Sequence, residues 1–417
     1  MKKILFLIIT LIIGYTAISL FNDNSQKLAD DLKQPIKEEI KPVVEKDITK
    51  DTYLNNITYK VSLDKDIENL IIEYMDEYYK SIHTLKEYDL TYLFSNQEQA
   101  DINQTAISLL IESRLLKNND LHLTDAYYDL EVLSVKNEKN KIIVEVEEDS
   151  YVNFSFMSDI QSKSFNISNI FTFEKVGEEY KIAEYFKIQD FFVMISNKYE
   201  EEKDLDKIKQ EYLNIIKENI LKTEDDYASY LAGTGHTPLT CDNDYNREKA
   251  ISYSYKWIKE RNPKWYKSSD SNCQNYASLV LYVGGIPMDI KGNYLSQGKF
   301  YSPADEQWVI IKEEKKRGIS YSWINVKKFR EYVNKNKGYG LCAKADVNLF
   351  YGEPGDIIQV GYLDSQKHTV VVSDTYEKDG KVIDILVNSN TIDLENYPMS
   401  AYSYPYYSLI KIYGWNN

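Results

Sequence analysis

The spacing of apolar residues divides the chain into a first part with helices followed by strands and a second part in which the two alternate. In the first part, apolar residues recur at helical spacing and then give way to short runs rich in aromatic and β-branched residues. The pattern predicts helices at 63–79 and 102–116, and strands at 127–135, 141–147, 151–157, 165–176 and 180–188. Helices followed by an antiparallel run of strands is an α+β order.

Over residues 60–196 this element order resembles the NTF2-like cone fold, and the resemblance implies an NTF2-like α+β domain there. The two histidines of this domain, His83 and His122, show no metal-ligand spacing. The acidic, Lys-rich stretch 197–226 predicts a solvated connecting helix, and the sequence LAGTGHTP predicts a break in the chain. We therefore expect residues 197–238 to connect the NTF2-like domain to a second domain at 240–417.

The N-terminus has the pattern of an export signal. Lys2 and Lys3 precede an apolar run that extends to residue 21. Residues 1–21 fit a cleaved signal peptide and are also about long enough to remain as a single membrane anchor. Residues 22–59 are charge-dense and read as a flexible linker. The folded body is therefore expected outside the cytoplasm, either secreted or anchored by its N-terminal segment.

The second part alternates helical and extended patterns. Asp242, Asn243 and Asp244 are cap candidates for a helix that runs to Arg261. A second helix follows Asp270, and further elements are predicted as a helix at 326–333 and strands at 355–360, 369–373, 382–387 and 409–413.

Cys273 lies in the first turn of the helix after Asp270. Asp270 and Ser271 are good N-cap residues, and Gly284 and Gly285 suit the helix end. The unpaired N–H groups of a helix N-terminus favour an anion, which lowers a thiol's pKa and suits a nucleophile. The alternative is that Cys273, on the apolar side of its helix, is a small core residue.

The chain has three cysteines, so at least one is unpaired. We expect Cys273 to be the free one, and a bridge between Cys241 and Cys342 is compatible with the count. The net charge of -15 belongs to the first part, because the chain from Cys241 onward carries +2. No Lys/Arg cluster with interleaved aromatics occurs, which argues against nucleic acid as a partner.

A nucleophilic thiol needs a base, and the base needs a residue that orients it. The second part offers His236, in the interdomain break, and His368, at the start of a strand. Asn388 and Asn390, two residues apart on the next strand, project to the same side, and either could orient the imidazole. An exposed loop histidine and turn-forming asparagines are the alternatives.

Five stretches of the second part together resemble the bacterial family known as the putative amidase domain. They are YNREKAISYSYKW, CQNYASLVLYVGGIPM, GDIIQV, KHTVVVS and LVNSNTIDLENYPM. That family is related to the CHAP and NlpC/P60 peptidases within the papain-like class. The resemblance implies a papain-like domain at 240–417 in which Cys273 is the nucleophile and His368 the base, and Asn275 matches the Asn two places after the family's cysteine.

The chain departs from that family at three places. Asn272 stands where the family usually has Asp directly before the cysteine, and Asn390 stands where a histidine is common. Ser278 is followed by Leu279 where the family often has Ser-Gln. Because the resemblance aligns Asn390 with a polar site position, we expect Asn390 rather than Asn388 to orient His368.

The sequence therefore predicts an exported cysteine-dependent amidase or peptidase that acts on an amide bond, with peptidoglycan or a peptide as candidate substrate. Cys273, His368 and Asn390 would form the site, and the Cys273 N–H would help to hold the oxyanion. No metal or organic cofactor is implied. The alternatives are a non-catalytic module for wall binding or assembly, and a surface or sporulation protein whose first domain recruits a partner.

Overall fold

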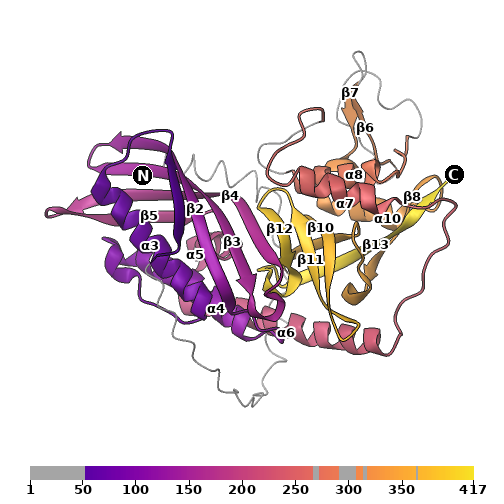
Figure 1. Ribbon diagram of the computed structural model, residues 1–417, viewed down its shortest axis with the longest axis horizontal. Coiled ribbons are helices and arrows are strands. Elements are labelled where there is room, and N and C mark those ends of the chain that lie inside the picture. The colour runs from indigo at the N-terminus through magenta and orange to yellow at the C-terminus, as the bar shows by residue number, and fades with distance from the viewer. Residues whose placement is uncertain (1–51, 266–271, 291–306, 313–316, 363–364) are drawn as a thin grey trace. The chain divides into compact units, whose positions relative to one another are not determined.

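The computed structural model describes residues 52–265, 272–290, 307–312, 317–362 and 365–417 (Figure 1). These residues belong to one compact unit. The predicted signal or anchor, most of the predicted linker and Asp270 lie outside the described residues. Within the described ranges, no helix is long and apolar enough to cross a membrane.

The first part packs helices against a meander of strands. Its helices are α3 (Lys65–Thr84), α4 (Gln97–Leu115), α5 (Asp190–Glu202) and α6 (Leu205–Leu231), with 3-10 turns at Thr91–Leu93 and Ser155–Met157. Its strands are β1 (Leu54–Tyr59), β2 (Leu123–Glu138), β3 (Lys141–Phe154), β4 (Gln161–Val176) and β5 (Glu179–Lys187). Strands β2 to β5 pair antiparallel in chain order, and β1 pairs in parallel with β2.

Side-chain caps start both early helices. The Asp64 carboxylate accepts a hydrogen bond from the Asp66 N–H at the start of α3, and the Asn96 side chain accepts from the N–H groups of Glu98 and Gln99 at the start of α4. Each bond satisfies a backbone donor that the first turn of a helix leaves unpaired. The apolar face of α3 is then buried in the core that it shares with β2.

Two predictions for the first part were wrong in detail. The strands predicted at 141–147 and 151–157 are one strand, β3, because Glu148 in the polar stretch between them is buried in an ion pair with Lys187 at 2.8 Å instead of forming a turn. Residues 54–59, expected in the flexible linker, form β1, whose ladder to β2 is made by the backbone and leaves most of its side chains exposed.

The second part contains four helices and eight strands within the described residues. The helices are α7 (Arg247–Lys256), α8 (Cys273–Val283), α9 (Tyr321–Ile324) and α10 (Val326–Lys335), with 3-10 turns at Leu349–Tyr351 and Met399–Ala401. The strands are β6 (Ile310–Lys312), β7 (Arg317–Ile319), β8 (Gly340–Val347), β9 (Ile357–Tyr362), β10 (Ser365–Lys378), β11 (Lys381–Ser389), β12 (Asp393–Pro398) and β13 (Tyr406–Asn416).

The caps predicted for α7 were placed too early. The helix begins after Asn246, whose side chain accepts from the Lys249 N–H, and it ends at Lys256 instead of Arg261. Asn243 instead exchanges two backbone hydrogen bonds of 3.0 Å with Trp415 in β13. The segment of the predicted caps is therefore held at a sheet edge and not at a helix start.

One sheet runs through both parts of the chain, in the order β1-β2-β3-β4-β12-β11-β10-β9-β13-β8, with β5 also pairing with β4. Strands β12 and β4 join the parts through three residue pairs. Lys163 and Glu395 form an ion pair of 2.7 Å across this joint. The structure combines a large sheet with helices, which is compatible with the predicted α+β class, while the NTF2-like and papain-like assignments remain predictions.

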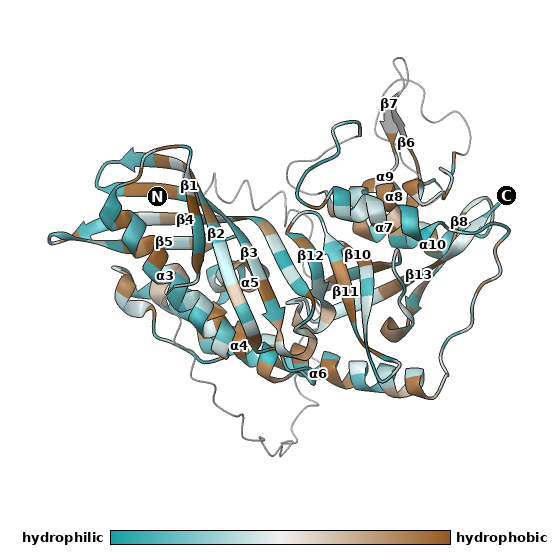
Figure 2. Ribbon diagram, in the orientation of Figure 1, coloured by the Kyte–Doolittle hydropathy of each residue, from teal (hydrophilic) through white to brown (hydrophobic). Residues whose placement is uncertain are grey.

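The central strands of the second part have a helix-covered face and a second buried face. Ile357 of β9 and Val371 of β10 pack into a core with α8, whereas Ile358, Val370 and Val372 pack into a separate core. Side chains along a strand alternate between the two faces. Figure 2 shows α8 coloured largely as hydrophobic, in keeping with its burial against this sheet.

Cys241 and Cys342 form a disulfide with a Cα–Cα distance of 6.1 Å, and Cys273 is the free cysteine. The prediction of which thiol is free is therefore confirmed. The bridge that the sequence left open ties the segment before α7 to β8, next to the Asn243 and Trp415 pairing.

Candidate active site

Cys273 is the first residue of α8 and is only 4 % exposed. Asn272 occupies the N-cap, but its side chain does not cap the helix by accepting from a backbone N–H of the first turn. The backbone N–H groups of Thr369, Gln274 and Cys273 itself all approach the sulfur and favour its thiolate form. The thiol therefore lies where the start of α8 meets β10, with backbone donors directed at it.

The pKa of Cys273 is raised, in contrast to the expectation from its helix position. Burial is the largest influence and disfavours the charged thiolate, and the three backbone N–H groups and the nearby Arg261 charge offset only part of it. The thiol is thus neutral at pH 7 in this arrangement. The sequence argument failed because it weighed the helix terminus without the desolvation that accompanies 4 % exposure.

His368 lies on the other face of β10. It pairs with Val360 in β9, and its ring stacks with that of Tyr404 at a centroid distance of 6.5 Å. Val360 and Tyr404 both belong to the core on the side of the sheet away from α8. The neighbouring Thr369 faces α8, because its hydroxyl donates to Gln274 Oε1 at 2.9 Å.

The structure consequently does not bring the His368 imidazole to the Cys273 sulfur. His368 is 2 % exposed, and its Nε2 has no hydrogen-bond partner among the residues that the structure describes. Burial lowers the pKa of His368 to about 3, so the ring is neutral at pH 7. Thiol and imidazole are both uncharged here, whereas an activated pair would be thiolate and imidazolium.

Asn390 lies beside the cysteine and not beside the histidine. Its Oδ1 accepts from Asn272 Nδ2 at 2.6 Å, and its Nδ2 donates to the carbonyls of Trp257 and Ile258, each at 2.8 Å. Asn272 and Asn390 are two of the three positions at which the chain departs from the family pattern. The structure places these two side chains in direct contact, and Asn272 is the residue that precedes Cys273.

Asn275 extends the same network on α8. Its Nδ2 donates to Asn272 Oδ1 at 2.8 Å, and its Oδ1 accepts from Trp323 Nε1 at 2.9 Å. Asn388 lies further from the cysteine: its Nδ2 donates to Ser254 Oγ at 3.1 Å and its Oδ1 accepts from the Asn396 N–H at 3.0 Å. Neither Asn388 nor Asn390 is hydrogen-bonded to His368.

Sequence reasoning missed Thr369 and Gln274, which join β10 to α8 next to the thiol. Gln274 accepts from the Thr369 hydroxyl and donates to Ser278 Oγ at 3.3 Å. The only signal for these two residues in the sequence is their place in the chain, since each directly follows a predicted site residue. In the described residues, no group of three or more His, Cys, Asp or Glu side chains is arranged to hold a metal ion.

Asn390→Ala is expected to change the chemistry of Cys273, whereas Asn388→Ala is not. Loss of the Asn390 amide releases Asn272, which directly precedes the thiol, and removes the hydrogen bonds to the Trp257 and Ile258 carbonyls, costing on the order of 2 kcal/mol of stability. Asn388 is equally buried but has no contact with Asn272, so it is the matched control. The measurement is the alkylation rate of Cys273 by iodoacetamide, which should change several-fold in the first variant alone. Equal rates in both variants would contradict this assignment.

The low pKa of His368 predicts an acid-sensitive fold. The folded state keeps the ring neutral down to about pH 3, whereas the unfolded chain binds a proton below its ordinary pKa of 6.5. The free energy of unfolding is therefore unaffected by this histidine above pH 6.5. As the pH falls from 6.5 toward 3, the free energy of unfolding decreases by on the order of 1 kcal/mol per pH unit. Urea unfolding of wild type and His368→Leu at pH 7, 6 and 5 should give a shallower pH dependence for the variant. The same pH dependence of the unfolding free energy in wild type and variant would contradict this prediction.

Residues 244–415 match the family model described as "Putative amidase domain". This match confirms the resemblance predicted for the C-terminal half and supports a hydrolase that acts on amide bonds. The match includes α7, α8 and the strands from β8 to β13.

A relative in Bacillus subtilis (strain 168), "Uncharacterized protein YhbB", is 30% identical over 114 residues. The aligned region covers 27% of this chain and 32% of that relative, so the chain spans about a third of the relative's length. No solved structure matches the chain.

Proposed function

We propose that the C-terminal half is a cysteine-dependent amidase or peptidase in which Cys273 is the nucleophile. The observation that carries the proposal is the position of the free thiol at the first residue of α8, with backbone N–H groups directed at it, inside the region that matches the amidase family. The same N–H groups suit the oxyanion that forms when a thiolate attacks an amide carbonyl.

The proposal assigns the base to His368, and that role requires β10 to rearrange at its start. The β9–β10 pairing already contains a bulge between Gln366 and His368. Moving a bulge by one residue along its strand re-aims the residue that the bulge passes, while the residues beyond it keep their pairing. Movement of this bulge past His368 would turn the imidazole toward α8, where Thr369 now lies beside the sulfur.

This rearrangement gives His368→Gln a distinctive expected result. If the ring turns toward Cys273 when substrate binds, the variant should have a much lower kcat. The residual kcat should lack the pH dependence that the imidazole confers. Full turnover of His368→Gln would remove His368 from the mechanism while leaving Cys273 as the nucleophile.

We further propose that the protein acts outside the cytoplasm, on peptidoglycan or a peptide. The Cys241–Cys342 bridge supports this location, because disulfides persist in oxidising compartments. Mass analysis of purified wall fragments incubated with the protein should show one added water at one class of amide bond. Protease added to intact cells should also remove the C-terminal half; its protection until lysis would contradict the location.

A second candidate function is a non-catalytic module for wall binding or assembly. The observation that favours it is that Cys273 and His368 are both neutral and buried, with Cys273 at the start of α8 on one side of β10 and His368 on the other face of that strand. Such a module would retain wall binding and show no amide hydrolysis. Wall binding that survives in Cys273→Ala, together with no added water in any fragment exposed to wild type, would identify this function.

A further inference from the structure

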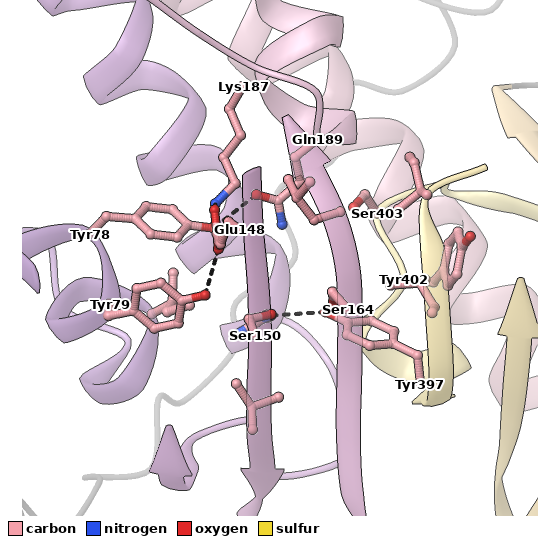
Figure 3. Close-up of a pocket in the computed structure, with 16 residues that line it drawn as sticks. Tyr78, Tyr79, Glu148, Ser150, Ser164, Lys187, Gln189, Tyr397, Tyr402 and Ser403 are labelled. Atoms are coloured by element: carbon pink, nitrogen blue, oxygen red, sulfur yellow. Dashed lines mark hydrogen bonds and ion pairs between the residues drawn. The ribbon is translucent and has the colours of Figure 1, made fainter. Parts of the chain in front are cut away.

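A cavity separate from Cys273 lies among α3, α4, β3, β4 and β5 of the first part and the segment around β12 (Figure 3). Its volume is about 50 Å³, room for on the order of four water molecules. Figure 3 shows Tyr78 and Tyr79 on one side, Glu148 and Lys187 at the centre, and Tyr397 and Tyr402 on the other side. The lining is rich in hydroxyl groups and contains three charged side chains.

Two of these charges neutralise each other. Lys187 Nζ lies 2.8 Å from Glu148 Oε2 and 3.1 Å from Oε1, and both side chains are 2 % exposed. Burial is the largest single influence and would lower the pKa of Lys187, but the Glu148 carboxylate and Tyr78 together outweigh it, and the pKa is raised. Tyr79 and Asn169 also donate to Glu148, at 2.6 and 2.9 Å. The Glu148 carboxylate thus has four donor contacts from within the protein.

Arg114 is the third charge, and no carboxylate among the described residues pairs with it. It belongs to the last turn of α4, lines the cavity and is 7 % exposed. One terminal nitrogen, Nη2, donates to the Tyr397 hydroxyl at 3.2 Å, and the guanidinium lies 5.4 Å from the centre of the Phe154 ring. The other, Nη1, is buried without a hydrogen-bond partner in the described part of the chain.

A buried guanidinium is permanently charged, and a buried charge without a counter-ion is costly. The cavity therefore carries one uncompensated positive charge beside an empty volume. Because Glu148 is held by Lys187, Tyr79 and Asn169, it is not available as the counter-ion. The missing partner is a single negative charge with oxygen acceptors, of a size set by about 50 Å³.

We propose that this cavity binds a carboxylate group, with Arg114 as its counter-ion. A carboxylate matches the planar donor set of a guanidinium, and a carboxylate with its α-carbon has about as many non-hydrogen atoms as the cavity holds waters. The Tyr397 hydroxyl that accepts from Arg114 can donate its own proton to the same ligand. The proposal is independent of the role of Cys273.

The carboxylate could come from a free small acid or from the C-terminus of a peptide. Isothermal titration of the full chain with acetate and with isosteric, neutral acetamide tests the charge requirement. The dipeptide Gly-Gly and its C-terminal amide then distinguish a peptide end from a small acid. We expect saturable binding of acetate, of Gly-Gly or of both, and at least tenfold weaker binding of the matching amide.

Variants locate the site. Arg114→Met should weaken carboxylate binding at least tenfold, whereas Lys136→Met, which removes an exposed charge from β2, should not change it. The comparison of acetate with acetamide on wild type remains decisive if Arg114→Met does not fold. Equal binding of acid and amide, binding of chloride as tight as that of acetate, or carboxylate binding that survives in folded Arg114→Met would each overturn the proposal.

Discussion

Replacing Cys273 with alanine is expected to lower kcat/KM for amide hydrolysis by at least about a thousandfold, because the acyl-enzyme route has no other nucleophile. Cys273 is the free cysteine, and the remaining two are bridged. No second thiol can therefore take over. Hydrolysis of a wall fragment or a simple amide, followed by mass spectrometry, measures the effect.

The control for this prediction is Cys273→Ser, which nearly preserves the volume of a side chain that is 4 % exposed. Its unfolding midpoint should stay close to that of wild type while its turnover is lost, since a serine hydroxyl needs stronger activation than a thiol. Turnover retained in both variants would exclude Cys273 as the nucleophile, even if the protein is an amidase.

Loss of the Cys241–Cys342 bridge is expected to lower the free energy of unfolding by about 2–5 kcal/mol. The bridged cysteines are 101 residues apart, and cross-linking a long loop restricts the unfolded chain more than cross-linking a short one. The bridge also fixes the segment before α7 against β8 at the sheet edge. Urea unfolding of the Cys241→Ser, Cys342→Ser double variant measures the effect.

Reduction of wild type should reproduce the midpoint of the double variant, because both remove the same cross-link. Reduction of the double variant itself should change nothing, which separates the bridge from other effects of the reductant. An unfolding free energy equal to that of oxidised wild type would show that the bridge does not stabilise the fold.

The sequence predicted the elements with strong apolar periodicity. It missed or divided strands whose formation depends on partners far away in the chain. The pattern located α3, α4, α8 and the meander, because their apolar spacing matches their burial. It missed β12, whose ladder depends on β4, more than 200 residues earlier in the chain. It also divided β3 at a polar stretch, because the partner that lets Glu148 be buried, Lys187, lies on β5.

The sequence could indicate the residues of the candidate site, but not the strand face on which each of them lies. The sequence identified Cys273 at a helix start and two asparagines on one side of a strand, and Asn388 and Asn390 do share the face toward α7 and α8. Which face of β10 carries His368 depends on the strand's register and on the bulge before it. Neither follows from local spacing, so the orienting role predicted for Asn390 stays a prediction.

Covalent trapping tests the central claim most directly. Wild type and Cys273→Ala are mixed with an amide substrate, quenched in acid within the first turnover, digested and analysed by mass spectrometry. The account predicts an acyl adduct on the wild-type peptide that contains Cys273 and none in the variant. Hydrolysis by wild type with no adduct on Cys273, or with an adduct on another residue, would contradict it.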